Sequence, residues 1–156
     1  MIAAGGIADG RGLLAALALG ADAVLMGTRF LAATETPIHR NFKDWIVSHT
    51  ENDTSVVMRS IKNPMRVMDN ATAKTVCEIE ARGTTLEEIL TYAAGKFGKQ
   101  AYNSGDVDMG IISVSEGMGL IEDVKPIKEI MADIVAEAEE GLKRLKKIMG
   151  DGNVKK

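Results

Sequence analysis

Short apolar runs alternate with glycine-containing stretches along the first thirty residues. Residues 1–4 and 23–26 are apolar runs of the length and composition of strands buried on both faces. Between them lies an Ala- and Leu-rich run in which Leu13, Leu14 and Leu17 fall on one side of a helix. The pattern therefore predicts strand, helix and strand, with parallel strands because the crossover between them is right-handed.

Two polar residues mark the ends of this first helix. Asp9 precedes it and is expected to cap its first turn, since a carboxylate accepts hydrogen bonds from free N–H groups there. Gly20 follows it at the position where a left-handed residue ends a helix without a Cβ penalty. A second helix is expected to start at Gly27, directly after the second strand.

Hydrophobic spacing after Pro37 predicts a mainly helical region. Helices are expected at 38–49, 71–82 and 126–149, with another after Thr85, and extended segments at 54–59 and after Pro64. Asn70 is a predicted cap, and Thr85 with Glu88 fits a capping box. Residues 103–118 read as irregular, and 151–156 as a frayed tail.

Composition and charge exclude several classes of protein. The net charge of −3 and the lack of clustered basic residues give no case for nucleic-acid binding. No apolar run approaches the length of a membrane span, so no membrane partner is expected. Cys77 is the single cysteine, which favours a reducing cytoplasm over a disulfide-bonded setting. His39 and His49 lack metal-ligand spacing, and no metal is predicted.

Glycines follow both predicted strands of the N-terminal unit. Gly5-Gly6 and Gly27-Thr28 would place backbone N–H groups at the carboxyl ends of neighbouring parallel strands. In a (β/α)8 barrel, the loops after the last two strands form a phosphate site of this kind. The alternative is that these glycines only permit tight turns. Arg59, Lys62 and Arg66 leave a similar choice between an anion site and solvated charge, and solvated charge is favoured.

The glycine motifs also resemble a known family. AGGIADGRG at 4–12, ALGADAV at 18–24 and MGTRF at 26–30 resemble the last two barrel strands of the FMN-dependent nitronate monooxygenases. Flavin-containing enoyl-acyl-carrier-protein reductases are close relatives of that family. Similarity continues more weakly through 62–67, 105–110 and 119–121. The resemblance implies an α/β chain, with the last two β-α units of a (β/α)8 TIM barrel in 1–50 and a mainly helical C-terminal region in 51–156.

The same resemblance implies a cofactor and its contacts. FMN phosphate would bind N–H groups of Gly6, Gly27 and Thr28, with the Thr28 hydroxyl adding a bond. Arg29 would add charge or face the adjacent strand ends. The full set of residues expected to contact the cofactor is Gly5, Gly6, Leu25, Met26, Gly27 and Thr28. The family's catalytic histidine lies upstream of these strands, so no catalytic residue is assigned. Ser115-Glu116 stands where the family commonly has Gly-Gln.

Several activities remain open on this basis. The family reaction oxidises an alkyl nitronate with O2 to a carbonyl compound and nitrite, and the alternative is reduction of an enoyl thioester by NAD(P)H through FMN. The glycine motifs also resemble the barrel of inosine monophosphate dehydrogenase, although Arg29-Phe30 favours the flavin family. Gly10-Arg11-Gly12 matches a dinucleotide fingerprint, but it stands too far beyond the first strand.

Length bears on all of these alternatives. A complete barrel needs about 250 residues, whereas the chain has 156. We therefore expect that an N-terminal barrel segment is missing or that the chain forms a homo-oligomer. In either case the chain alone should have no activity toward a small-molecule substrate. The alternative of another class is that the chain is a non-catalytic oligomerisation module.

Overall fold

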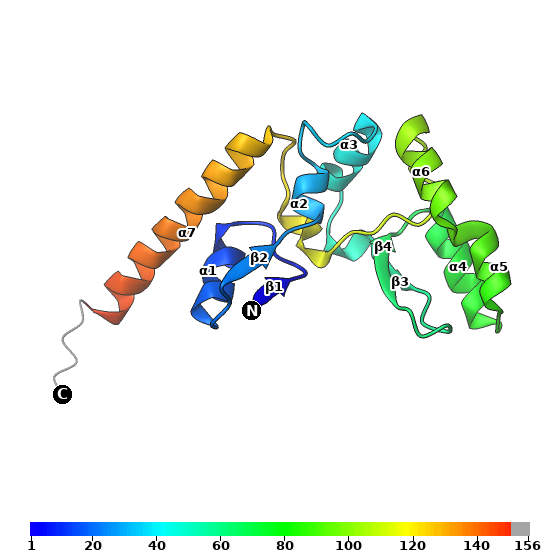
Figure 1. Cartoon of the computed structure of the whole chain (residues 1–156), viewed down its shortest axis with the longest axis horizontal. Coiled ribbons are helices and arrows are strands. Elements are labelled where there is room, and N and C mark those ends of the chain that lie inside the picture. The colour runs from blue at the N-terminus through cyan, green and yellow to red at the C-terminus, as the bar shows by residue number, and fades with distance from the viewer. Residues whose placement is uncertain (151–156) are drawn as a thin grey trace.

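The computed structural model describes residues 1–150 and is α/β, with two small sheets in different parts of the molecule (Figure 1). In the first sheet, β1 (Ile2–Ala4) pairs in parallel with β2 (Ala23–Leu25), and α1 (Gly10–Ala18) connects them. Asp9 caps α1 by accepting a hydrogen bond of 2.9 Å from the Gly12 N–H. Gly20 follows the helix with a φ of +96°. These observations confirm the predicted β-α-β unit.

The second sheet is an antiparallel hairpin that follows three short helices. These helices are α2 (Thr28–Leu31), α3 (Arg40–Ser48) and the 3-10 helix η1 (Glu51–Asp53). Strand β3 (Thr54–Val57) then pairs with β4 (Met65–Met68). The sequence predicts both extended segments but not their pairing, because pairing depends on residues that are distant along the chain. Residues 112–114 run beside β4, where the Met68 N–H donates to the Ile112 carbonyl at 2.9 Å.

Three helices lie at the same end of the molecule as the hairpin, where α4 contacts β3, α5 contacts α4 and α6 contacts α5 (Figure 1). They are α4 (Ala71–Ala81), α5 (Leu86–Ala93) and α6 (Gly95–Ser104). Asn70 caps α4 as expected, accepting from the Ala73 N–H at 2.8 Å. The expected capping box at Thr85 forms only in part. Thr85 accepts from the Glu88 N–H, but the Glu88 carboxylate accepts from the Thr84 hydroxyl and does not return to the cap. The sequence misses α6, whose glycines lower its helix propensity.

The long helix α7 (Ile127–Met149) returns to the N-terminal unit and lies along α1 (Figure 1). It follows the 3-10 helix η2 (Glu116–Leu120), which lies within the segment expected to be irregular. Gly10 lets α1 and α7 approach closely, because a Cβ there would lie 2.4 Å from the Glu137 Cβ and from the Ile134 carbonyl oxygen. The predicted tail at 151–156 lies outside the described residues.

The apolar core is concentrated away from the parallel strands. One cluster joins α3, α6 and η2 through fully buried side chains such as Phe42, Ile46 and Met118. A second cluster joins the hairpin to α4 and α5. By contrast, Ile2 of β1 is 68 % exposed and Leu25 of β2 is 66 % exposed. Across residues 1–150, no helix has both the length and the apolar character that a bilayer crossing needs.

Candidate functional site

The two glycine loops meet at a hollow of about 240 Å³. Because β1 and β2 are parallel and paired, the loops that follow them lie side by side. A third segment of the chain, from the approach to η2, completes the wall. The lining residues are Ala4, Gly5, Gly6, Ile7, Leu25, Gly27, Thr28, Ser113, Val114 and Ser115. Of the residues predicted to contact a cofactor, only Met26 is not on this wall, and it packs beside Ala33, Ile130 and Ile134.

The three glycines of the hollow differ in backbone conformation. Gly5 and Gly6 have φ angles of +92° and +71°, which L side chains rarely adopt. Gly27 has an ordinary φ of −90°. A Cβ added at any of the three would meet no atom within 4 Å. The fold therefore requires glycine at positions 5 and 6, whereas nothing in the described residues requires it at position 27.

Backbone donors face no protein acceptor at this hollow. Within residues 1–150, the N–H groups of Gly6, Gly27 and Thr28 donate to no other protein group. The buried Thr28 side chain is fixed by the Ser115 N–H, which donates to Thr28 Oγ1 at 2.9 Å. That bond uses an acceptor site of the hydroxyl and leaves its proton free to be donated. Free N–H groups at glycine turns suit an anion, so these residues fit a phosphate group.

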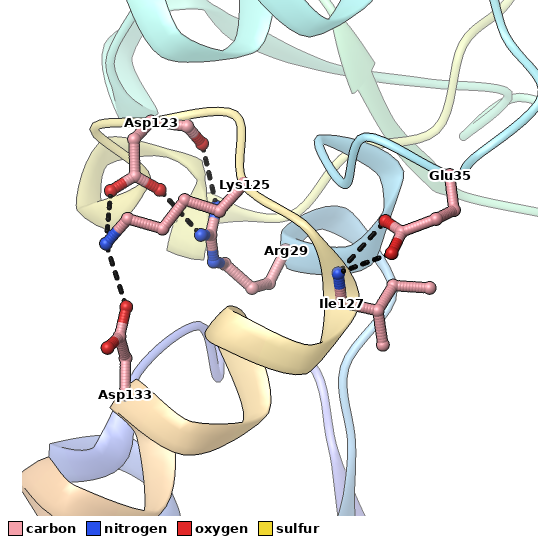
Figure 2. A network of polar contacts seen from close by, with 6 residues as sticks. All are labelled: Arg29, Glu35, Asp123, Lys125, Ile127 and Asp133. Atoms are coloured by element: carbon pink, nitrogen blue, oxygen red, sulfur yellow. Dashed lines mark hydrogen bonds and ion pairs between the residues drawn. The ribbon is translucent and has the colours of Figure 1, made fainter.

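Arg29 takes no part in the wall of the hollow. Its guanidinium is buried and donates to the Asp123 carbonyl at 3.0 Å and to the Asp123 carboxylate at 2.7 Å (Figure 2). Burial would raise the pKa of Asp123, but hydrogen bonds from Lys125 and Arg29 outweigh it and lower that pKa. Arg29 therefore joins α2 to the segment before α7. Its partner Asp123 lies neither in the phosphate loop nor at a strand end, so these contacts match neither of the two alternatives expected for Arg29.

The same network fixes the start of α7. Lys125 bridges the carboxylates of Asp123 and Asp133 at 2.9 and 2.8 Å, and these bonds raise its pKa (Figure 2). Glu35 accepts from the Ile127 N–H through both carboxylate oxygens, at 2.9 and 3.1 Å. A carboxylate at a helix N-terminus is favourable because it satisfies free N–H groups and the helix dipole. This network holds the start of α7 near α2, the helix that begins at Thr28.

Sequence reasoning missed the third wall of the hollow. Ser115 is tied to Thr28, and the next residues continue along the glycine loop. A Cβ at Gly117 would lie 2.7 Å from the Gly6 carbonyl oxygen, so η2 packs directly on that loop. Glu116, between them, forms an ion pair of 2.6 Å with Arg66 of β4. The signal in the sequence for this segment is Ser115-Glu116, which stands where the resembling family commonly has Gly-Gln.

Other candidate residues have structural roles. His39 caps α3 by accepting from the Asn41 N–H at 3.2 Å. His49 stacks on Trp45 with ring centroids 4.0 Å apart. Burial raises the pKa of the Cys77 thiol, which makes it a poor nucleophile. Among residues 1–150, no three potential metal ligands gather at one point.

The basic trio does not form a free anion site. Arg66 is engaged by Glu116, and its guanidinium also donates to Thr54 Oγ1 at 2.7 Å. Arg59 lies close enough to Glu80 to help lower the pKa of that carboxyl. The interpretation favoured from the sequence is solvated surface charge, but only 33% of the Arg66 side chain is exposed and it is paired with Glu116.

The sequence matches a family and longer relatives within it. The family model for nitronate monooxygenase matches residues 1–137. The nitronate monooxygenase of Neurospora crassa is 32% identical over 155 residues, which cover 93% of this chain and 39% of that protein. The probable nitronate monooxygenase of Staphylococcus saprophyticus is 43% identical over 70 residues, which cover 45% of this chain and 20% of that protein. The chain therefore spans less than half the length of these relatives.

Solved structures support the same assignment. FabK from Thermotoga maritima superposes with a TM-score of 0.87 at 39% identity, covering 94% of this chain and 46% of the other. The fold of this chain is therefore shared with part of a longer protein. The chain belongs to the nitronate monooxygenase family.

Proposed function

We propose that this chain carries the phosphate-binding part of an FMN-dependent oxidoreductase. The observation that carries the proposal is Gly27, which has ordinary backbone angles, open space beside its Cα and an N–H group without an acceptor in residues 1–150. Nothing in residues 1–150 demands glycine there, but a phosphate lying against the backbone would. Gly6 and Thr28 supply further N–H donors, and the Thr28 hydroxyl supplies another. FMN, when bound, supplies the redox chemistry.

The proposed reaction is oxidation of an alkyl nitronate with O2 to a carbonyl compound and nitrite. Family membership and the similarity to curated nitronate monooxygenases support it. The second candidate is reduction of an enoyl thioester, which the similarity to FabK at 39% identity favours. In either case the chain's own residues hold and orient the cofactor phosphate. A cytoplasmic location stays a prediction that follows from the single cysteine.

We further propose that the parallel pair β1–β2 is covered by additional parallel β-α units, which complete a (β/α)8 barrel. Parallel sheets are nearly always covered on both faces, whereas Ile2 and Leu25 are exposed. An apolar hollow beside β1 and α1, lined by residues such as Ala3, Ala15 and Leu19, offers a seat for a helix of those units. The units belong either to a longer form of this protein or to a second chain. A homo-oligomer is the competing outcome, and mass measurement distinguishes the two.

The test of the phosphate site is an FMN titration followed by flavin fluorescence and thermal melting. Gly27→Ala should leave stability within about 0.5 kcal/mol because its φ is ordinary and its Cβ meets open space. The same variant should weaken FMN binding by at least roughly tenfold, since a methyl group would occupy the phosphate position. Gly20→Ala is the control for effects of stability on binding. Its φ of +96° should make that variant less stable, but Gly20 does not line the hollow, so FMN binding should be retained. FMN binding by Gly27→Ala that equals wild type would disprove the site.

The two candidate reactions are separated by supplying the barrel units of a longer relative. Turnover of an alkyl nitronate with O2 supports the first reaction, and oxidation of NAD(P)H with an enoyl thioester supports the second. The chain alone should be inactive in both assays, because it holds no residue assigned to catalysis.

A further inference from the structure

The residue that follows the last wall residue of the hollow is Glu116, whose carboxylate pairs with Arg66 and does not itself line the hollow. Among the described residues that line the hollow, none carries a charged side chain. Glu116 directly follows Ser115 of the wall and directly precedes Gly117, which touches the Gly6 loop. A phosphate monoester carries about −1.5 to −2 charges at neutral pH. An unpaired carboxylate at position 116 would therefore oppose the ligand that the hollow is proposed to bind.

Arg66 answers this charge from the neighbouring strand. One guanidinium nitrogen lies 2.6 Å from Glu116 Oε1, and another donates to Thr54 Oγ1 at 2.7 Å. Thr54 therefore fixes one end of the planar group while the other end meets the carboxylate. The backbone of Arg66 is also tied to the wall, because its carbonyl accepts from the Val114 N–H at 3.3 Å. Strand β4 thus supplies the positive charge of Arg66 and also holds, through its backbone, the segment that contains Glu116.

We propose that Arg66 is a positioning residue that neutralises Glu116 and keeps the hollow receptive to a doubly charged phosphate. This inference rests on the proposed function of the hollow. The pair is partly open to solvent, with 33% of the Arg66 side chain and 63% of the Glu116 side chain exposed. Such pairs add little to stability. The role of this pair is to balance charge beside a binding site.

The negative charge of Glu116 is what gives Arg66 its role in this arrangement. A neutral amide needs no partner, whereas Glu116 requires a cation to leave the local charge balanced. Removing Arg66 alone should expose the carboxylate to the phosphate, and removing both charges should restore the balance. Riboflavin lacks the phosphate and should respond to neither change.

The experiment compares FMN and riboflavin binding by wild type, Arg66→Met, Glu116→Gln and the double variant. Arg66→Met should weaken FMN binding roughly three- to tenfold, as expected for partly screened charges at this range. Its riboflavin affinity should stay within about twofold, and the double variant should recover the FMN preference to within about twofold. High salt should shrink the deficit of the single variant. Arg82→Met is the matched control, because it removes an arginine from an exposed ion pair with Glu88 on the helical part.

Three other outcomes would contradict the role of Arg66, and one of them would also contradict the phosphate site. Equal losses of FMN and riboflavin affinity in Arg66→Met, not rescued by Glu116→Gln, would make Arg66 a support of the wall and overturn the inference. A wild-type preference for FMN that Arg66→Met retains in full would also overturn it, while the phosphate site stands. No preference for FMN over riboflavin in wild type would overturn the phosphate site and this inference together.

Discussion

The parallel pair β1–β2 and the hairpin β3–β4 are both two-stranded sheets, yet they bury their side chains very differently. Val57 and Val67 of the hairpin are fully buried beneath α4 and α5. Ile2 and Leu25 of the parallel pair are largely exposed, with α1 as the packed neighbour. The hairpin region thus closes its own core. The parallel region holds the candidate binding site but leaves its apolar faces open.

The difference in burial between the two sheets suggests that one region provides stability and the other provides the binding site. Burial of apolar surface is the main favourable contribution to folding, so the hairpin and its helices should carry most of the stability of the chain. The glycine loops at the hollow bury little and are shaped by backbone conformation and by contacts from η2. Substitutions in the hairpin core should therefore mainly lower stability, whereas a substitution in open space at the hollow, such as Gly27→Ala, should mainly change binding.

The largest expected effect comes from a matched pair of isoleucines. Ile89→Ala in the hairpin core should lower the free energy of unfolding by about 2–5 kcal/mol, because it leaves a cavity among fully buried neighbours. Ile2→Ala on the exposed strand should change it by less than about 0.5 kcal/mol. Urea denaturation of both variants measures the contrast. Similar losses in the two variants would mean that the parallel pair is covered in solution, as in a homo-oligomer.

A smaller effect should follow when α1 and α7 are pushed apart. Gly10→Ala places a methyl group against the Glu137 Cβ and the Ile134 carbonyl oxygen, so overpacking should cost about 1–3 kcal/mol. The loss should lie in the parallel region and leave the hairpin core intact, which amide hydrogen exchange can resolve region by region. Gly27→Ala, with open space at its Cβ, is the control. Uniform loss of protection across both regions would show that they unfold as one unit.

The smallest effect is a pH dependence confined to the hairpin. Burial would raise the pKa of Glu80, but hydrogen bonds from Ser60 and Met58 outweigh it and lower that pKa. Because the folded pKa lies below the unfolded value, the stabilisation is present above about pH 4.5 and is lost as the pH falls further. Glu80→Gln should lower stability at pH 7 by about 1–2 kcal/mol and flatten the acid side of the stability curve. A wild-type acid slope retained by this variant would contradict the assignment.

Local signals in the sequence predicted much of the fold. Asp9 and Asn70 cap their helices as expected, because a cap depends on residues within three positions. Gly5, Gly6 and Gly20 adopt positive φ angles at the predicted turns. The boundaries shift by a few residues. For example, the strand expected at 54–59 ends at Val57 because Met58 turns into the left-handed region.

Features that depend on distant partners were not predictable from the pattern. Helix α6 contains Gly95 and Gly98, and its place is fixed by close packing, since a Cβ at Gly110 would lie 2.8 Å from the Gly98 nitrogen. The third wall of the hollow comes from residues 113–115, far from the glycine loops along the chain. Arg29 faces Asp123 for the same reason, a partner 94 positions away. Sequence spacing indicates which residues are neighbours within one helix or strand, but it does not predict contacts between residues that are distant along the chain.

The hydrogen bond between Ser115 and Thr28 can form only late in biosynthesis, after both residues have been synthesised. The two residues are 87 positions apart. Since translation adds about 5–20 residues per second, Thr28 leaves the ribosome roughly 4–17 s before its partner does. During that interval the nascent glycine loops have no third wall, and the donors have no fixed geometry. The proposed phosphate site is therefore complete only after residue 115 has been synthesised, and its Thr28–Ser115 contact cannot guide the folding of the first thirty residues.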